Sequence, residues 1–253
     1  MKQTISKYLK ALSDLLIPRT CIICDRKLIV EEKHICLKCM LDIPYTYFWT
    51  LSRNPMADKL NEILQEWMDK ERLDKETYAY ACALFFFNSD AGYIRIPYQL
   101  KYHGDITAGR FFARLLAERI SSSPHLSDVD LVVPVPLHSL RKWERGYNQA
   151  EIIAEEIAGT LNCGIRCDIL KRKRRTRTQT KMSVEEKSAN VADAFTTIEE
   201  EGLNLAMHHR HILIVDDVFT TGSTVAECYI SLRKKLPPAI RISVATLGFV
   251  GRA

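Results

Sequence analysis

The sequence predicts an α/β fold in which helices flank a parallel sheet, with a small cysteine-containing module at the N-terminus. Strand-like and helix-like segments alternate from Tyr78 onward, and such alternation is typical of a parallel sheet with right-handed crossovers. Two Cys-x-x-Cys pairs precede that region. We therefore predict three parts: residues 1–50 with an N-terminal helix and the cysteine module, residues 51–77 as a connecting helix, and residues 78–253 as the sheet domain.

The first seventeen residues resemble an amphipathic helix more than a signal peptide. Apolar residues recur there at helical spacing, while Lys7, Lys10 and Asp14 interrupt any continuous apolar run: the apolar positions are Ile5, Leu9, Leu12 and Leu16. No apolar stretch in the chain approaches the ~20 residues that span a bilayer. We therefore expect a cytoplasmic protein that does not insert into membranes.

The four N-terminal cysteines have the spacing of a metal site. Cys21 and Cys24 form one pair, Cys36 and Cys39 form another, and eleven residues separate the pairs. Two such pairs supply the four thiolates of a closed structural Zn²⁺ site. Disulfides are the alternative, but they require an oxidising compartment. His34 could replace one thiolate, although four cysteines already complete the site. The remaining cysteines are scattered and are expected to be structural: Cys82, Cys163, Cys167 and Cys228.

The secondary structure of the rest follows from its periodicity. Residues 51–77 place Leu60, Ile63, Leu64 and Trp67 on one helical face. Residues 78–98 resemble a hairpin or strand-turn pair, and residues 108–116 a helix. A strand is expected at residues 129–135, and a helix from Asn148, which Glu151 follows at the spacing of a capping box. A further strand, residues 240–247, follows Pro237-Pro238.

Residues 212–224 carry the strongest chemical signal. Four aliphatic residues, 212–215, suit a strand buried on both faces, and ligands of parallel sheets bind beyond the carboxyl ends of the strands. Asp216 and Asp217 are expected there, where carboxylates suit ribose hydroxyls or Mg²⁺. The turn that follows suits a 5′-phosphate, since it offers hydroxyls, a glycine and a helix start: Thr220, Thr221, Gly222, Ser223 and Thr224.

Two alternatives remain for this segment, namely a strand end followed by an ordinary capped helix, or a magnesium-binding fold of another kind. Gly-Lys-Ser/Thr and Gly-x-Gly-x-x-Gly are both absent from the sequence, which argues against ATP and dinucleotide ligands. The segment resembles the phosphoribosyl-pyrophosphate (PRPP) signature of type I phosphoribosyltransferases. That resemblance implies a phosphoribosyltransferase-like sheet that binds PRPP together with Mg²⁺.

A second strand-to-helix segment, residues 132–150, is rich in basic side chains. Arg141 and Arg145 could bind a pyrophosphate, although a solvated basic loop is equally consistent with the residues alone. The segment resembles the ComF family motif, in which Pro-Val-Pro precedes Arg-Gly-Phe/Tyr-Asn-Gln. Residues 100–105, residues 178–195 and the cysteine pairs match the same family, which implies a zinc ribbon joined to a phosphoribosyltransferase domain.

The family resemblance does not extend to a glutaminase. Amidophosphoribosyltransferases share the Pro-Val-Pro and Gly-Tyr features, but the chain begins Met1-Lys2 and its first cysteine is Cys21. We therefore expect no N-terminal cysteine nucleophile for a glutaminase. Within residues 100–105, Lys101 and His103 could contact a ligand, yet a surface lysine and a turn histidine are commonplace.

The positive charge of the chain is concentrated in residues 171–187. This segment contains eight basic and two acidic residues, so its net charge of +6 exceeds the +5 of the whole chain. Phosphoribosyltransferases have a mobile loop in this region that closes over PRPP, and the resemblance implies this role for Gln179 and Lys187. Lys187 stands where many relatives have arginine, which weakens its grip on phosphate oxygens. A solvated basic run is the alternative.

Two functions are consistent with these features. The first is a phosphoribosyltransferase, hence an enzyme of the glycosyltransferase class, whose acceptor cannot be identified from the sequence. The second is a non-catalytic protein of the same fold that handles single-stranded DNA during competence-linked DNA uptake, as the ComF resemblance implies, with a competence helicase as a further partner. Intact acids at 216 and 217 favour the first, because a pure polyanion binder gains nothing from them.

Overall fold

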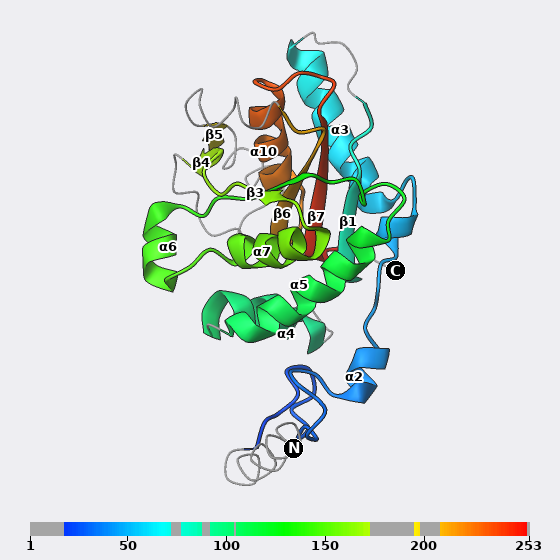
Figure 1. The fold of residues 1–253 in the computed structure, drawn as a ribbon, viewed down its shortest axis with the longest axis vertical. Coiled ribbons are helices and arrows are strands. Elements are labelled where there is room, and N and C mark those ends of the chain that lie inside the picture. The colour runs from blue at the N-terminus through cyan, green and yellow to red at the C-terminus, as the bar shows by residue number, and fades with distance from the viewer. Residues whose placement is uncertain are drawn as a thin grey trace.

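The computed structural model describes residues 18–71, 77–87, 92–103, 105–172, 195–197 and 208–251. Its centre is a five-stranded sheet whose neighbouring strands are all parallel (Figure 1). The strand order across the sheet is β1 (Ala81–Phe86), β7 (Arg241–Phe249), β6 (His211–Phe219), β2 (Leu131–Pro134) and β3 (Gly164–Ile165). The predicted α/β class is confirmed.

Strand β6 lies at the middle of the sheet and is buried because its first half is aliphatic. Residues 212–215 have no measurable exposure, as expected for a strand covered on both faces. The strand continues to Phe219, since Val218 and Phe219 pair with Gly248 and Phe249 of β7. Asp216 and Asp217 therefore lie within the last part of the strand, and our expectation that they follow it was wrong.

Helices cover both faces of the sheet. Helices α5 (Ile106–Ser121) and α7 (Gln149–Leu161) pack on each other and on one face, in front of the sheet in Figure 1. Helices α3 (Pro55–Glu71) and α10 (Ser223–Arg233) cover the other face. Helix α7 begins as predicted, because the Asn148 side chain accepts a hydrogen bond from Ala150 N at 3.1 Å.

Helix α3 is part of the main core and does not stand apart as a connection. Met56, Leu60 and Leu64 are buried in one hydrophobic cluster with the sheet residues. The helix start is fixed by Asn54, whose carboxamide oxygen accepts hydrogen bonds from Met56 N and Ala57 N, while its nitrogen donates to the carbonyl of Ala81 on β1. The start of β1 and the start of α3 are thus tied together.

In the described parts of residues 78–98, namely residues 78–87 and 92–98, the hairpin or strand-turn pair that we expected does not form. Strand β1 pairs in parallel with β7, and the chain after it is helical in three short pieces: η2 (Gly92–Ile94), α4 (Arg95–Tyr98) and the π-helical turn η3 (Gln99–His103). The buried positions 93, 96, 97 and 100 follow helical spacing. In addition, Pro97 has no N–H to donate to a strand ladder.

Two short strands and a short helix complete this part of the fold. Strands β4 (Leu170–Arg172) and β5 (Phe195–Thr197) form an antiparallel pair that contacts α10. Helix α6 (Ser139–Arg145) has no buried residue and projects from the body of the fold (Figure 1). Among the helices of the described ranges, none combines the length and the hydropathy that a membrane span requires.

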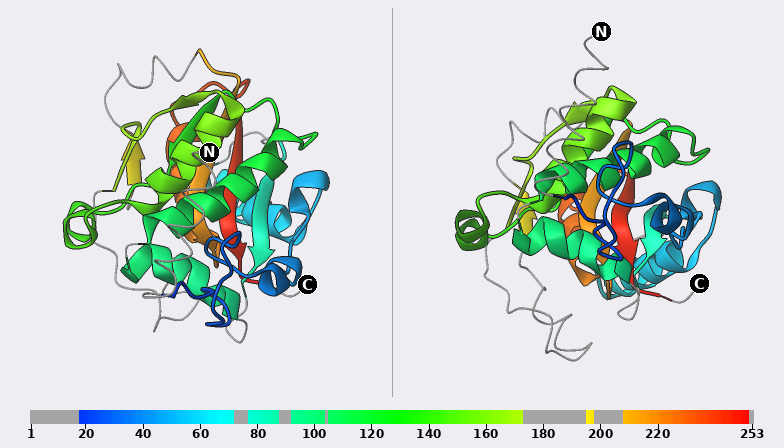
Figure 2. Two further views of the ribbon diagram at one scale, coloured as in Figure 1. Left: turned by 60° about the horizontal axis from the view of Figure 1, so that its bottom comes forward. Right: turned by 90° about the horizontal axis from the view of Figure 1, so that it is seen from below.

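The cysteine module lies beside α4 and α5, as Figure 2 shows from two further directions. It contains helix α2 (Leu37–Leu41) and is followed by the 3₁₀ turn η1 (Phe48–Thr50). The contacts that hold it there include an ion pair of Arg95 with Asp25 at 2.6 Å and a hydrogen bond from the Tyr93 hydroxyl to the Cys39 carbonyl at 3.0 Å.

Candidate functional site

The two strand-to-helix segments singled out in the sequence meet at the carboxyl edge of the sheet. Strands β2 and β6 are parallel neighbours in which Pro134 pairs with Val215, and Val135 N donates to the Val215 carbonyl at 2.8 Å. The loop after β2 therefore starts beside Asp216. This arrangement follows from the topology, since the carboxyl ends of parallel strands share one edge.

The two adjacent acids are in different environments. Asp217 is 3% exposed, and its Oδ2 lies 2.6 Å from Lys101 Nζ. Asp216 is partly exposed, and its Oδ1 accepts a hydrogen bond from Asp217 N at 2.9 Å. Burial, followed by repulsion from Asp217, raises the pKa of Asp216 to about 7, although Lys101 and Arg172 act in the opposite direction. Asp216 can therefore exchange a proton near neutral pH.

Lys101 is the functional candidate that the sequence undervalued. It lies in η3, and neither its local pattern nor its neighbours in sequence distinguish it from an ordinary surface lysine. The ion pair with Asp217 joins the Leu-Lys-Tyr-His-Gly-Asp segment to the acidic strand end. The only signal available in the sequence was the family match of residues 100–105, which does not specify a partner for the lysine.

The hydroxyl-rich turn, residues 220–224, is compact and closely covered. The hydroxyl oxygens of Thr221 and Ser223 are 3.0 Å apart, and Lys59 of α3 donates to the Thr220 carbonyl at 3.0 Å. Gly222 has φ 86°, and a Cβ there would lie 2.6 Å from Cζ of Phe219. Glycine is thus required both for the left-handed backbone and for the close approach of the ring. Helix α10 begins directly after it at Ser223.

Basic side chains surround the acids unevenly. Arg172 packs its guanidinium 5.0 Å from the centre of the Phe195 ring. Burial, followed by repulsion from Arg141, lowers the pKa of Arg172, and attraction to Asp216 opposes this shift. Arg141, Arg172 and Asp216 therefore influence one another electrostatically. Arg172 is a second residue that sequence reasoning placed in the basic segment without linking it to the acids.

The other predicted phosphate-binding residues are less closely tied to the acids. Arg145 donates a hydrogen bond to the side chain of Gln149 at the start of α7. Next to it on α6, Lys142 pairs with Glu151 at 2.8 Å and Trp143 is 84% exposed. Gln179 and Lys187, which we assigned to a closing loop, lie outside the described residues.

The four N-terminal cysteines converge as predicted. Their sulfur atoms all lie within 4.8 Å of one another, and Cys24 Sγ is 3.7 Å from Cys36 Sγ. Tetrahedral Zn²⁺ with Zn–S bonds of ~2.3 Å places sulfurs about 3.8 Å apart, whereas a disulfide requires ~2.05 Å. The cluster therefore fits a structural zinc ion and not a pair of disulfides.

The hydrogen bonds of the cluster favour a thiolate at Cys36. Cys36 N donates to Cys21 Sγ at 3.4 Å, and Cys39 N donates to Cys36 Sγ at 3.5 Å. Burial opposes ionisation of Cys36, but hydrogen bonds from the Cys39 amide and the neighbouring thiols lower its pKa to about 7. Burial, together with the neighbouring cysteines, raises the pKa of Cys39. His34 lies against the Phe111 ring, with centroids 5.5 Å apart, and is not one of the clustered ligands.

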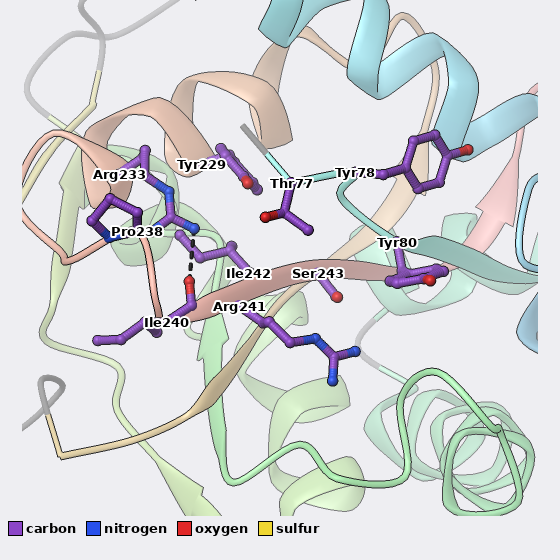
Figure 3. A pocket seen from close by; sticks show the side chains of 10 residues that line it. All are labelled: Thr77, Tyr78, Tyr80, Tyr229, Arg233, Pro238, Ile240, Arg241, Ile242 and Ser243. Carbon is purple, nitrogen blue, oxygen red and sulfur yellow. Dashed lines mark hydrogen bonds between the residues drawn. The ribbon is translucent and has the colours of Figure 1, made fainter. Parts of the chain in front are cut away.

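A small hollow lies at the start of β7, at the edge of the sheet opposite to the two acids, and is not a second ligand site (Figure 3). Residues at the start of β7 and the end of α10 line it, and its volume of about 20 Å³ leaves room for about one water molecule. Arg233 occupies one wall and donates to the Ile240 carbonyl at 2.7 Å. This hollow lies at the amino edge of the sheet, away from the acids.

The chain is similar over about half its length to proteins with related names. Competence protein F of Haemophilus influenzae is 34% identical over 139 residues, which is 54% of this chain and 59% of that protein. DNA utilization protein YhgH of Salmonella typhimurium is 37% identical over 135 residues, 52% of this chain and 57% of that protein. The Escherichia coli K12 protein of that name is 34% identical over 133 residues, 51% and 56% of the two chains.

These similarities confirm the resemblance to the ComF family for the part of the chain that they cover. The chain spans less than two thirds of the length of each of these relatives. No protein-family model matches the sequence.

Proposed function

We propose that this protein binds a phosphoribosyl ligand, PRPP with Mg²⁺, at the carboxyl edge of the sheet and transfers the phosphoribosyl group to an acceptor. The observation that carries the proposal is the placement of Asp216 and Asp217 in the last part of β6, two residues before a hydroxyl-rich turn and the start of α10. Carboxylates suit the hydroxyls of a pentose, while a turn of hydroxyls and amide N–H groups suits its phosphate. One strand end thus offers both chemistries.

Cations near the two acids would stabilise the negative charge of the departing pyrophosphate. When pyrophosphate leaves, negative charge accumulates on it and positive charge on the sugar, so stabilisation is mainly electrostatic. Among the described cations, Lys101 pairs with Asp217, Lys101 and Arg172 act on Asp216, and Arg141 acts on Arg172. The carboxylates of residues 216 and 217 are the protein oxygens suited to hold Mg²⁺, which would neutralise part of the charge on the pyrophosphate. The acidic side chains in turn favour the positively charged sugar.

Calorimetric titration with PRPP and Mg²⁺ tests this function. We expect wild type to give a saturable heat, and a variant carrying Asp216→Asn and Asp217→Asn to lose it. Asp168→Asn is a matched control, since Asp168 is a surface acid paired with Arg166. The absence of heat in wild type, or an unchanged heat in the double variant, would overturn the proposal.

A second candidate function is favoured by the names of the relatives, which refer to competence and to DNA utilization. In this reading the protein handles single-stranded DNA and keeps the fold as a scaffold, with a competence helicase as a predicted partner. The exposed Trp143 and the basic side chains of α6 suit a nucleic acid, because aromatic rings stack on nucleobases and cations bind phosphates.

Binding of a fluorescent oligothymidylate at two salt concentrations distinguishes the two functions. DNA binding should weaken steeply with salt and should fall in Trp143→Ala, whereas PRPP binding should require the acids and Mg²⁺. Tyr47→Ala is the matched control, because Tyr47 is also an exposed aromatic residue, 59% accessible, and it lies at the N-cap of η1, outside α6. Salt-sensitive DNA binding without PRPP heat would favour the scaffold function.

A further inference from the structure

The pair formed by Lys101 and Asp217 is the most enclosed ion pair at the candidate site. The Lys101 side chain is 28% exposed and that of Asp217 only 5%. A carboxylate this far from water is costly unless a cation or hydrogen bonds compensate it. Lys101 therefore compensates the charge of Asp217, although Oδ2 of Asp217 has no hydrogen bond of regular geometry to any described residue. The same lysine also acts on Asp216, since it is one of the groups that oppose the rise in the pKa of that residue.

The backbone that carries Lys101 is held on both sides. Leu100 is fully buried, and a Cβ at Gly109 would lie 2.5 Å from Leu100 Cδ1, so only a glycine of α5 allows this approach. The Tyr147 hydroxyl donates a hydrogen bond to the Leu100 carbonyl. Tyr147 belongs to the Arg-Gly-Tyr-Asn-Gln segment, so two segments distant in sequence position one lysine. The π-helical turn at residues 99–103 is a geometry that often accompanies functional sites.

We propose that Lys101 is an exchangeable partner of Asp217: it holds the carboxylate before ligand binds and moves to a phosphate oxygen when the ligand binds. Asp217 then accepts hydrogen bonds from the pentose hydroxyls in place of the ammonium group. No covalent bond changes in this step, which is an exchange of partners. The inference rests on the proposed PRPP site and adds a mechanism of ligand selection to it.

The exchange selects ligands that carry both chemical groups. A ligand with hydroxyls and phosphate satisfies both halves of the separated pair. A simple anion such as pyrophosphate satisfies Lys101 but leaves Asp217 buried without a partner, and a neutral sugar leaves Lys101 without one. PRPP should therefore bind more tightly than pyrophosphate or ribose. The difference in affinity should exceed what the extra direct contacts of PRPP contribute, because only PRPP gives both Lys101 and Asp217 a new partner.

Calorimetry with PRPP, pyrophosphate and ribose in the same Mg²⁺ buffer tests the inference on the full chain. In Lys101→Met we expect PRPP affinity to fall by about 10- to 100-fold, as for loss of a hydrogen bond to a charged group. Lys101→Arg should recover part of that loss, and Tyr147→Phe should show a smaller loss. The exposed Lys235 at the end of α10 supplies the control variant Lys235→Met, which should bind as wild type does.

Because Lys101→Met leaves Asp217 buried without its partner, a second variant guards against loss of folding. Lys101→Met/Asp217→Asn removes both charges, should unfold cooperatively, and should also bind PRPP weakly. Unchanged affinity in a folded Lys101→Met variant, or pyrophosphate binding as tight as PRPP binding in wild type, would overturn this inference and leave the proposed function standing. Absence of PRPP binding in wild type would overturn both.

Discussion

Replacing Asp216 with asparagine should stabilise the protein at neutral and alkaline pH. The pKa of Asp216 is raised from 3.8 to about 7 in the folded protein, so between these values the folded state binds more protons than the unfolded state. The ionised carboxylate therefore costs stability above pH 7, and this cost disappears as the pH falls toward 4. Asparagine has no charge and removes the cost.

The magnitude follows from the size of the shift. A shift of about three units corresponds to ~4 kcal/mol at ~1.36 kcal/mol per unit. Asp216 is partly exposed, so solvent screens part of this and ~2 kcal/mol is a better expectation at pH 8. At pH 5 the gain should fall to less than about half of that, because the folded carboxyl is then mostly protonated. Urea unfolding at both pH values measures the difference.

Asp217 provides the matched control for this measurement. Asp217→Asn should lower the unfolding free energy by ~1–3 kcal/mol, because Lys101 loses its buried partner. Two adjacent acids should therefore give opposite signs. The reasoning would be refuted if Asp216→Asn destabilised the protein at pH 8, or if its effect were the same at pH 5. An acid whose removal stabilises the fold is typical of a functional site.

Three further predictions concern stability and metal content. In urea unfolding, Gly222→Ala should lower the free energy of unfolding by ~1–3 kcal/mol, because φ is 86° there and the ring of Phe219 blocks a Cβ. Gly159→Ala is the control and should be neutral or stabilising, because position 159 of α7 is helical and has open space around it. Equal losses of stability in the two variants would contradict this prediction. Burial lowers the pKa of His211 below 6.5, although its neighbouring carboxylates oppose this shift. The stability of the protein should therefore decline as the pH falls below 6.5, and the decline should be smaller in His211→Gln. Parallel stability profiles of the two proteins against pH would show that His211 is not the group responsible. Elemental analysis of the purified protein should find about one zinc ion per chain. Cys21→Ser should lose the zinc, and the control Cys163→Ser should retain it. A full zinc content in Cys21→Ser would contradict the four-thiolate site.

The features predicted best from the sequence are those in which one short segment encodes both structure and chemistry. Residues 212–217 specify a buried strand and its acids, and each cysteine pair fixes the spacing of two thiolates. Residues 93–98 were wrongly predicted as a strand because aromatic and β-branched side chains are also common in strands. Only the pairing of β1 with β7 and the helical turns after it showed that a helical period applies.

Long-range partners were beyond the reach of local patterns. Lys101 and Asp217 are far apart in the chain, and the hydrogen bond from Lys59 to Thr220 joins residues 161 positions apart. A lysine carries the same local signal whether it meets solvent or a buried carboxylate. Only the folded arrangement of η3, α3 and β6 distinguishes these lysines from the other lysines of the chain.

The position of α3 restricts how the protein can be shortened. A truncated chain beginning at Tyr78 would leave the apolar surfaces of β1 and α10 uncovered where Met56, Leu60 and Leu64 now pack, and the carbonyl of Thr220 would lose its lysine donor. Such a fragment should be poorly soluble and should self-associate. A minimal soluble fragment must therefore begin before Asn54, whose side chain joins α3 to β1.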